Sequence, residues 1–305
     1  AEYLWFEHKY GKDRAEYHRM NEMNGYFGQV FGAGAHPLIH YYYDDKGQMF
    51  DAHSYNKGGL VLHMLRNYVG DEAFFASLNK YLTDNAFTAV EVDELRLAFE
   101  DTTGEDLQWF FDQWFHKKGH PEVSVNYQLS NVDQQLEISV FQEASNVWAF
   151  PADVVVYYTD GSSQKQRLMI RNDRENFVLQ LNNKAVGAVV FDGESHIPGI
   201  IEENKTEEQW FNTFKLSPLF SDKYKACQMM AEDAILRNDL VALALDDSYY
   251  FFRDFAINAM MQNMVPAEFV QNIKTKSEKD EHSLVRESAV RALGSMEVAD
   301  KTSIY

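Results

Sequence analysis

The spacing of apolar residues changes twice along the chain, and this separates two helical regions from a strand-like one. Up to about residue 120, apolar side chains recur every three or four positions, as on one face of a helix. One predicted helix covers residues 55–69, and Gly70 is placed to end it. Its apolar face consists of Leu60, Val61, Met64, Leu65 and Tyr68. The glycine-rich segment 25–37 is predicted to be a loop.

Strand-like alternation begins after the sequence Gly119-His-Pro121. Apolar and polar residues alternate over residues 123–129 and 136–140, which is typical of strands with one buried face. The turn sequence Thr-Asp-Gly-Ser at 159–162 lies between two apolar segments and predicts a β-hairpin. With the segments 177–181 and 186–191, we expect six or seven short strands. This number and spacing predict a β-sandwich over residues 121–203.

Helical spacing returns over residues 204–305. Residues 252–260 and 284–293 are similar to helices of HEAT-like solenoids, in which an arginine precedes a small apolar face. A stacking neighbour of the last helix can lie beyond Tyr305, so this HEAT-like domain can be truncated. The sequence therefore predicts a multidomain α and β protein with domains at 1–120, 121–203 and 204–305.

Composition narrows the classes of function. The chain has 305 residues, of which 45% are hydrophobic, and this supports packed globular domains. Its 47 acidic and 28 basic residues give a formal net charge of −19. Nucleic-acid binding is excluded as a class because it depends on clustered Lys and Arg. No apolar segment reaches the roughly 20 residues of a membrane span, so we expect a soluble protein in a compartment that the sequence does not indicate.

Several patterns that resemble catalytic or metal sites lack a necessary part. The glycine-rich segment has no Gly-Lys-Ser/Thr, and no Gly-x-Ser-x-Gly motif supports a serine hydrolase. His36 and His40 have the spacing of a zinc-binding pair, but a proline follows His36 and would disturb the helix. A glycine likewise separates His116 from His120. Cys227 is a single cysteine in an apolar helical pattern, which favours a small core residue.

One segment carries a more specific resemblance. Asp51-Ala-His-Ser-Tyr-Asn-Lys-Gly-Gly-Leu60 resembles the catalytic-tyrosine segment of the aminopeptidase N-like family of zinc peptidases, the gluzincins. Ala1-Glu-Tyr-Leu-Trp5 resembles the helix that follows that family's zinc-ligand glutamate. Residues 106–114, followed by Gly119-His-Pro121, resemble the end of its catalytic domain. The resemblance implies that residues 1–120 are the helical end of a thermolysin-like catalytic domain, which a β-sandwich and a helical domain then follow.

The zinc motif of that family, His-Glu-x-x-His, does not occur in these 305 residues. The resemblance therefore implies that the zinc ligands and the general-base glutamate lie N-terminal to Ala1. In the parent enzyme, zinc-activated water would remove N-terminal residues from peptide substrates. We expect this C-terminal fragment to be inactive without its N-terminal domains and to bind no metal or other cofactor. The alternative is a non-catalytic binding or scaffold protein that uses its sandwich and helical surfaces.

Tyr55 is the candidate catalytic residue. The resemblance implies that its hydroxyl donates a hydrogen bond to the tetrahedral intermediate, as oxyanion donors do; the alternative is a packed aromatic residue at a helix start. Gly58 and Gly59 reduce helix propensity, so we expect a neighbouring element to approach them closely. For Asp51 and His53, a solvated loop pair is favoured over a supporting role at the site.

Overall fold

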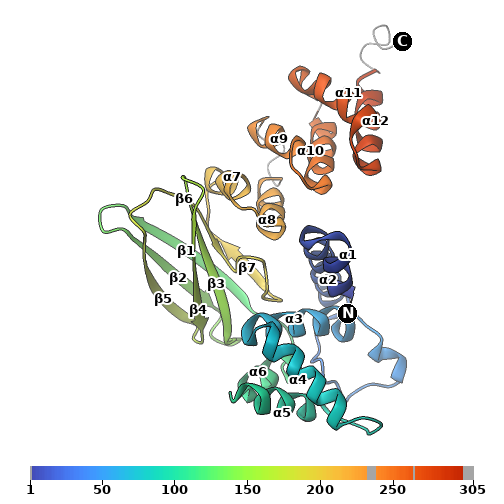
Figure 1. Cartoon of the computed structure of the whole chain (residues 1–305), viewed down its shortest axis with the longest axis vertical. Helices are drawn as coiled ribbons and strands as arrows, with labels where there is room; N and C mark the ends of the chain where they lie inside the picture. Colours follow the sequence, from blue (N-terminus) through green and yellow to red (C-terminus); the bar gives the residue numbers. More distant parts are fainter. Residues whose placement is uncertain (1, 232–237, 264, 298–305) are drawn as a thin grey trace. The chain divides into compact units, whose positions relative to one another are not determined.

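The computed structural model describes residues 2–231, 238–263 and 265–297. The chain divides into two compact units, which Figure 1 shows as ribbons. The first extends to Lys205 and includes Leu219–Ser221, and the second comprises Thr206–Pro218 and the described residues from Asp222 onward. None of the described helices is long and apolar enough to cross a membrane.

Helices form the N-terminal part of the first unit. They are α1 (Glu2–Tyr10), α2 (Lys12–Ala33), α3 (Gly58–Val69), α4 (Asp71–Asp84), α5 (Val92–Thr103) and α6 (Gln108–Phe111), with shorter turns η1 (Lys46–Met49), η2 (His53–Lys57) and η3 (Asp112–His116). The prediction for residues 55–69 is confirmed at its end, where Gly70 adopts a φ of 85°. At its start the helix is different, because residues 55–57 belong to η2, which is π-helical.

The predicted glycine-rich loop is wrong over most of its length. Gly25, Gly28 and Gly32 lie inside α2, which continues to Ala33. Their low helix propensity is outweighed by tertiary packing, since Met23 and Tyr26 of the same helix are buried. The loop begins at Gly34, whose φ of 94° ends the helix.

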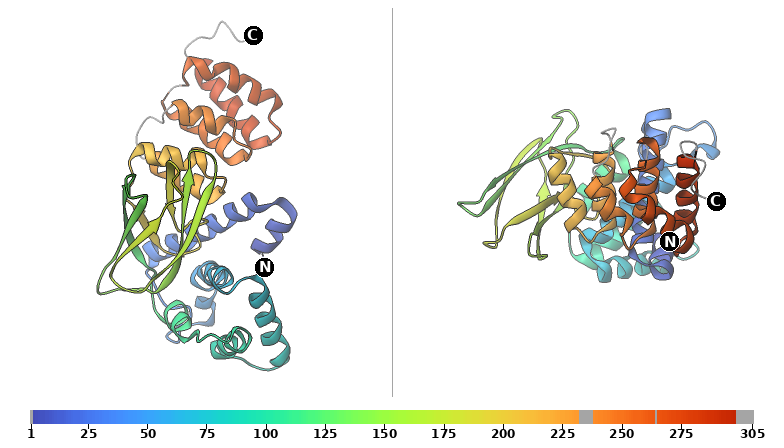
Figure 2. Two further views of the ribbon diagram at one scale, coloured as in Figure 1. Left: turned by 60° about the vertical axis from the view of Figure 1, so that its left-hand side comes forward. Right: turned by 90° about the horizontal axis from the view of Figure 1, so that it is seen from above.

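Seven strands form two sheets between residues 122 and 203 of the described chain. The first sheet has the order β5 (Arg174–Gln180), β2 (Gln135–Gln142), β1 (Glu122–Ser130) and β7 (Ile200–Glu203), with β7 parallel to β1. The second has the order β4 (Ser163–Ile170), β3 (Phe150–Tyr158) and β6 (Val186–Phe191). The predicted hairpin is confirmed, because β3 and β4 pair in antiparallel register around residues 159–162. Figure 2 shows the two sheets from further directions.

The helices and both sheets of the first unit share one hydrophobic core. Val61 and Leu65 of α3 belong to the same buried cluster as Ile138 of the first sheet and Val154 of the second. The side chains of Trp114 and Trp148 are both fully buried, and their ring centroids lie 4.9 Å apart. Residues of the two sheets thus pack into one interior, as a β-sandwich requires.

The second unit is helical. Its elements are α7 (Glu207–Leu216), most of α8 (Phe220–Met230), α9 (Asn238–Leu245), α10 (Tyr250–Asn263), the turn η4 (Ala267–Phe269), α11 (Val270–Lys279) and α12 (Ser283–Glu297). Helix α10 packs against α9 and α12, and α11 packs against α12. Cys227 of α8 is a buried free thiol, as predicted. The chain is therefore of mixed α and β class, and the HEAT-like character of this unit remains a prediction.

Candidate active site around Tyr55

Tyr55 lies in the middle of the π-helical turn η2. Its amide donates to the carbonyl oxygen of Asp51 at 3.1 Å, and the amide of Lys57 donates to that of Ala52 at 2.9 Å. Such wide turns are rare and are frequently found at functional sites. The Tyr55 side chain is 61% exposed, and its ring centroid lies 5.9 Å from that of Phe50. The turn therefore presents the hydroxyl of Tyr55 at the surface of this chain.

A pocket of about 430 Å³ opens beside Tyr55. Side chains of α1, α2, η2 and α3 line it, namely Glu2, Tyr3, His18, Arg19, Glu22, Tyr55, Asn56, Leu60 and His63, together with Gly59. The carboxylates of Glu2 and Glu22 lie 3.6 and 3.8 Å from Nε2 of His18. Burial raises the pKa of Tyr3 and lowers the pKa of His63 to about 2, so both are uncharged at neutral pH.

Arg19 lines this pocket and also contacts the loop that follows β6 of the second sheet. It is buried, donates to the Glu16 carboxylate at 2.6 Å, and also donates to the backbone carbonyl oxygens of Glu194 and Ser195. Glu194 and Ser195 have positive φ angles of 74° and 51°, which are uncommon for residues with a side chain. These contacts fix the position of α2 relative to the loop after β6.

Lys57 anchors the Tyr55 turn through contacts with more distant parts of the first unit. Its side chain is fully buried, and its ammonium group donates to the carbonyl oxygen of Gly119 at 2.9 Å. The rings of Tyr26 and Trp148 lie 5.7 and 5.9 Å from the ammonium nitrogen, within the range of cation–π interactions. Burial lowers the pKa of Lys57 to about 8. The hydroxyl of Tyr26 donates to the same Gly119 carbonyl at 3.1 Å.

The glycines after Lys57 are not explained by close packing. A Cβ atom at Gly58 would lie 3.8 Å from its nearest neighbour, and one at Gly59 would meet nothing within 4 Å. The expectation of close approach there is therefore wrong. Close approach occurs at Gly25 of α2, where a Cβ would lie 2.7 Å from Nδ2 of Asn56. No pattern in the sequence pairs Gly25 with the Tyr55 turn.

His36, Asp51 and His53 form a cluster beside the same turn. Nε2 of His36 lies 2.6 Å from Oδ2 of Asp51, and the rings of His36 and His53 stack at 3.8 Å. His53 is fully buried, so the predicted solvated pair of Asp51 and His53 is wrong. The ring of His40 lies 4.7 Å from that of His36. His120, the partner of His116 in sequence spacing, instead contacts the Tyr26 hydroxyl at 3.1 Å.

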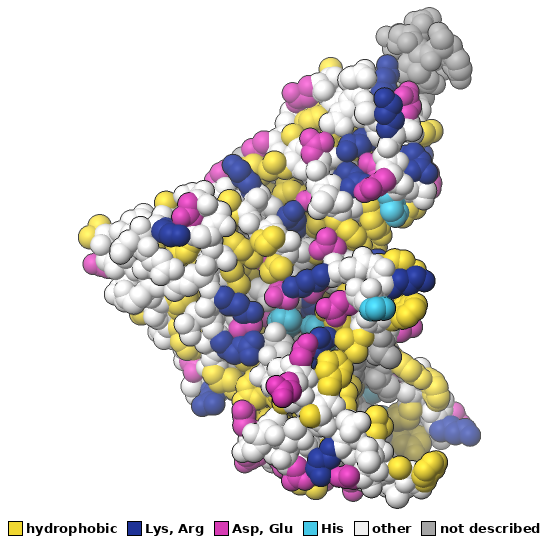
Figure 3. All heavy atoms as spheres, viewed as in Figure 1, with side chains coloured by type: hydrophobic (Ala, Val, Ile, Leu, Met, Phe, Trp, Pro, Cys, Tyr) yellow, Lys and Arg dark blue, Asp and Glu magenta, His cyan; other side chains and the backbone are white. Residues whose placement is uncertain are grey.

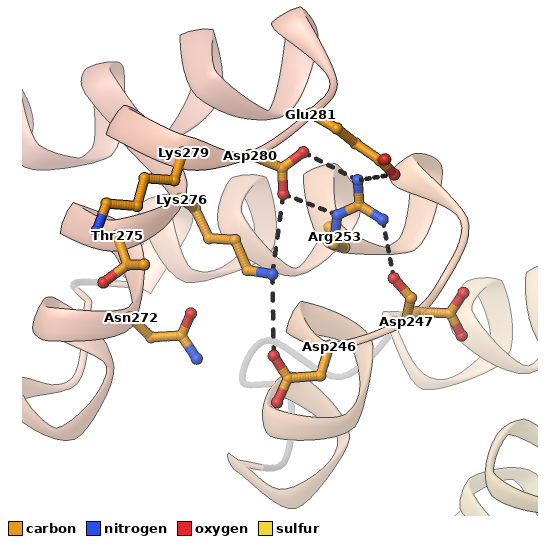
Figure 4. Close-up of a pocket in the computed structure, with 9 residues that line it drawn as sticks. All are labelled: Asp246, Asp247, Arg253, Asn272, Thr275, Lys276, Lys279, Asp280 and Glu281. Atoms are coloured by element: carbon orange, nitrogen blue, oxygen red, sulfur yellow. Dashed lines mark hydrogen bonds and ion pairs between the residues drawn. The ribbon is translucent and has the colours of Figure 1, made fainter.

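A second pocket, of about 440 Å³, lies in the second unit (Figure 4). At its wall the guanidinium of Arg253 makes two 2.9 Å bonds to the carboxylate of Asp280, and both side chains are buried. Lys276 lies 3.8 Å from both Asp280 and Asp246. The charges here pair with one another and join α10 to the end of α11. On the face displayed in Figure 3, basic and acidic side chains are likewise interspersed.

Known proteins that are similar to this chain include peptidases. Residues 1–114 match the model of the peptidase family M1 domain. Aminopeptidase M1-A of Oryza sativa subsp. japonica is 25% identical over 183 residues, which cover 58% of this chain and 18% of that protein. Aminopeptidase M1 of Arabidopsis thaliana is 30% identical over 158 residues, covering 50% of this chain and 17% of that protein. The chain thus matches less than a fifth of the length of each.

A solved structure shows a similar fold. The crystal structure of Legionella pneumophila aminopeptidase A in complex with aspartic acid aligns with 95% of this chain and 36% of its own chain, with a TM-score of 0.61 and 13% sequence identity. At this identity the likeness concerns the fold alone. Residues 1–114 are thus similar to the peptidase family M1 domain, and the matched relatives include M1 aminopeptidases, in agreement with the resemblance to the aminopeptidase N-like family.

Proposed function

We propose that this chain supplies one side of the active site of a zinc-dependent aminopeptidase, with Tyr55 as the hydrogen-bond donor to the tetrahedral intermediate. The observation that carries the proposal is the position of Tyr55, which stands exposed on a π-helical turn at the rim of a pocket. The turn lies inside residues 1–114, the segment similar to the M1 domain. A phenol donates without adding charge, which suits an oxygen that becomes negative during reaction.

The chain's own residues do not supply the zinc site of the family. The His-Glu-x-x-His sequence is absent from the 305 residues, so we propose that the zinc ligands and the general base come from polypeptide outside them. When bound, zinc would polarise the scissile carbonyl and activate water. Tyr55 would donate to the oxygen that becomes negative, and Lys57 would hold its turn through the Gly119 carbonyl. Peptides are the proposed substrates.

The test is hydrolysis of aminoacyl p-nitroanilides by two proteins. One is this chain alone, and the other joins it to the upstream half of an M1 peptidase domain from the same gene. We expect activity in the longer protein and none in the chain alone. Activity of the chain alone would contradict the proposal that the zinc ligands and the general base lie outside these 305 residues. If the longer protein is inactive and its natural upstream sequence has other residues in place of the zinc ligands, a binding or scaffold function would be favoured.

A further inference from the structure

We propose that His36, Asp51 and His53 form a binding site for a divalent transition-metal ion, distinct from the zinc site of the aminopeptidase relatives. One ligand atom from each of the three side chains lies within 4.8 Å of the other two. His36 and Asp51 belong to the segment that connects α2 to the Tyr55 turn, and His53 is the first residue of that turn. Sequence spacing did not suggest this group, because His36 is 15 positions before Asp51 and no helix joins them.

The hydrogen bonds of His36 call for a positive charge next to Asp51. Nδ1 of His36 lies 2.7 Å from the carbonyl oxygen of Pro37, and a carbonyl can only accept, so Nδ1 carries a proton. Nε2 of the same ring lies 2.6 Å from Oδ2 of Asp51. That carboxylate also accepts from Gln29 at 3.0 Å and from the amide of Ser54 at 2.8 Å, which favours its ionised form.

Two arrangements satisfy the short contact between Nε2 and Oδ2. Either His36 holds a second proton, or a metal ion takes the place of that proton. Metal-binding histidines usually donate their other ring N–H to a carbonyl, a carboxylate or water, as Nδ1 of His36 does to the carbonyl of Pro37. Gln29 would then orient the ligating oxygen Oδ2 through its 3.0 Å bond.

His53 supplies an independent observation. Its side chain is fully buried, and its Nδ1 has no hydrogen-bond partner among the described residues. This nitrogen lies 3.6 Å from Oδ2 of Asp51, on the side where the ion would sit. The Tyr26 ring packs edge-on against His53 with centroids 5.2 Å apart. Metal binding would satisfy a buried nitrogen that is otherwise unpaired.

Metal binding changes where the protons of His53 and His36 are held. Without metal, Nε2 of His53 accepts a long 3.3 Å bond from the amide of His36, so Nδ1 holds the ring proton. On coordination through Nδ1, that proton moves to Nε2 and the long bond is lost. His36 releases the proton on Nε2 and becomes a neutral ligand, as metal-binding histidines are. Binding of one ion therefore releases about one proton when His36 begins as the imidazolium.

The donor set selects the class of ion. Two imidazole nitrogens and one carboxylate oxygen suit Zn²⁺ and similar transition metals, whereas Ca²⁺ and Mg²⁺ prefer oxygen ligands. Tetrahedral zinc with bonds of about 2.0–2.2 Å separates its ligands by about 3.4 Å. The separations of 2.6 and 3.6 Å from Oδ2 of Asp51 are close to this value, and the stacked rings of His36 and His53, whose planes differ by 24°, would rotate so that both nitrogens face one ion. The His36 side chain is 22% exposed, which leaves an approach for the ion and for a water ligand.

Among the residues that the structure describes, the other group with suitable ligands is Glu2, His18 and Glu22. The Glu2 side chain is 81% exposed, and this group contains no buried nitrogen without a partner. It therefore serves as the internal control, because zinc attracted only by exposed carboxylates would bind there.

The experiment is calorimetric titration of the chelator-treated full chain with Zn²⁺ in two buffers of different ionisation enthalpy, which reports the number of protons released on binding. We expect one ion per chain and release of about one proton. His36→Asn and His53→Asn should each weaken binding by about 10-fold or more. The matched variants His40→Asn and His18→Asn remove neighbouring or competing imidazoles and should bind as the unmodified chain does.

Circular dichroism checks that each variant is folded, and His36→Asn, at a partly exposed position, provides the decisive result if His53→Asn does not fold. Replacement of Zn²⁺ by Co²⁺ should give visible absorption of an ion with nitrogen ligands, which His36→Asn should reduce. Absence of Zn²⁺ binding, unchanged binding by His36→Asn, or loss of binding in His18→Asn would each overturn the proposal. The outcome does not depend on the catalytic role of Tyr55.

Discussion

The ammonium group of Lys57 and the carbonyl oxygen of Gly119 are joined by a 2.9 Å hydrogen bond. Gly119 stands just before β1, and its φ of 88° turns the chain toward the sheet. Lys57 is two residues after Tyr55 and lies in the same π-helical turn. The position of the candidate catalytic tyrosine is therefore set partly by the residue at which the strands begin.

Burial of Lys57 predicts a distinct pH dependence of stability. Its pKa is about 8 in the folded chain and near 10.5 when unfolded, so above pH 8 the unfolded state binds more protons. The free energy of unfolding should therefore gain a contribution from Lys57 between pH 8 and 10.5. Lys57→Met should lack it. The measurement is urea unfolding followed by tryptophan fluorescence, with Trp210→Phe in both proteins so that the first unit is observed. The prediction would be contradicted if the free energy of unfolding changed with pH in the same way in both proteins.

Removal of the Tyr55 hydroxyl predicts a loss of catalysis without a loss of stability. In the longer protein, Tyr55→Phe should lower kcat by about 10² to 10³, by analogy with other oxyanion donors. The ring stays in place, and the side chain is 61% exposed, so the unfolding midpoint should not change. Steady-state kinetics of the two proteins provide the measurement. A kcat/KM close to that of the unmodified protein would reduce Tyr55 to a surface aromatic residue.

Two glycines in the first unit should respond to alanine in opposite directions. Gly59→Ala adds a methyl group in helix α3 where nothing lies within 4 Å, so it should stabilise by about 0.5–1 kcal/mol. Gly199→Ala would place a Cβ 2.7 Å from the carbonyl oxygen of Pro121, and should destabilise by about 1–3 kcal/mol. Chemical unfolding of both variants decides the signs. Equal effects would show that backbone propensity alone governs both positions.

The Arg253–Asp280 pair should dominate electrostatic stability in the second unit. Asp280→Asn leaves the buried guanidinium without its carboxylate and should cost about 3–5 kcal/mol. The control is Glu287→Gln, which breaks the exposed 3.9 Å pair with Arg291 and should cost less than about 0.5 kcal/mol. Thermal unfolding of the second unit gives both values. Similar losses in the two variants would mean that burial does not determine the strength of the pair.

Local patterns in the sequence predicted local structure well. The hairpin at residues 159–162 and the helix end at Gly70 are decided by neighbouring residues, so spacing and turn chemistry were sufficient. The continuation of α2 through Gly25 depends on packing against distant residues, which propensity cannot show. The parallel pairing of β7 with β1 joins segments about 80 residues apart and has no signature in either strand.

The region around Tyr55 shows the same limit. The motif identified the tyrosine as a candidate, and its role there remains a prediction. Lys57 is buried against Tyr26, Trp148 and the Gly119 carbonyl, which lie far from it in the sequence. His36 meets Asp51 within a loop, and no periodic pattern describes such a loop. The π-helical geometry of the turn was also missed, because helical spacing does not distinguish one wide turn from an α-helical one.

The contact between Trp114 and Trp148 has a consequence for how such proteins can be recombined. A cut or exchange of gene segments at residues 117–121 would leave each indole without the surface that covers it. Transplanted strands would then expose an aromatic patch and invite aggregation. A chimera that replaces residues 122–203 with the strands of a distant relative should therefore express as soluble protein only when the residues facing Trp114 are transferred as a matched set.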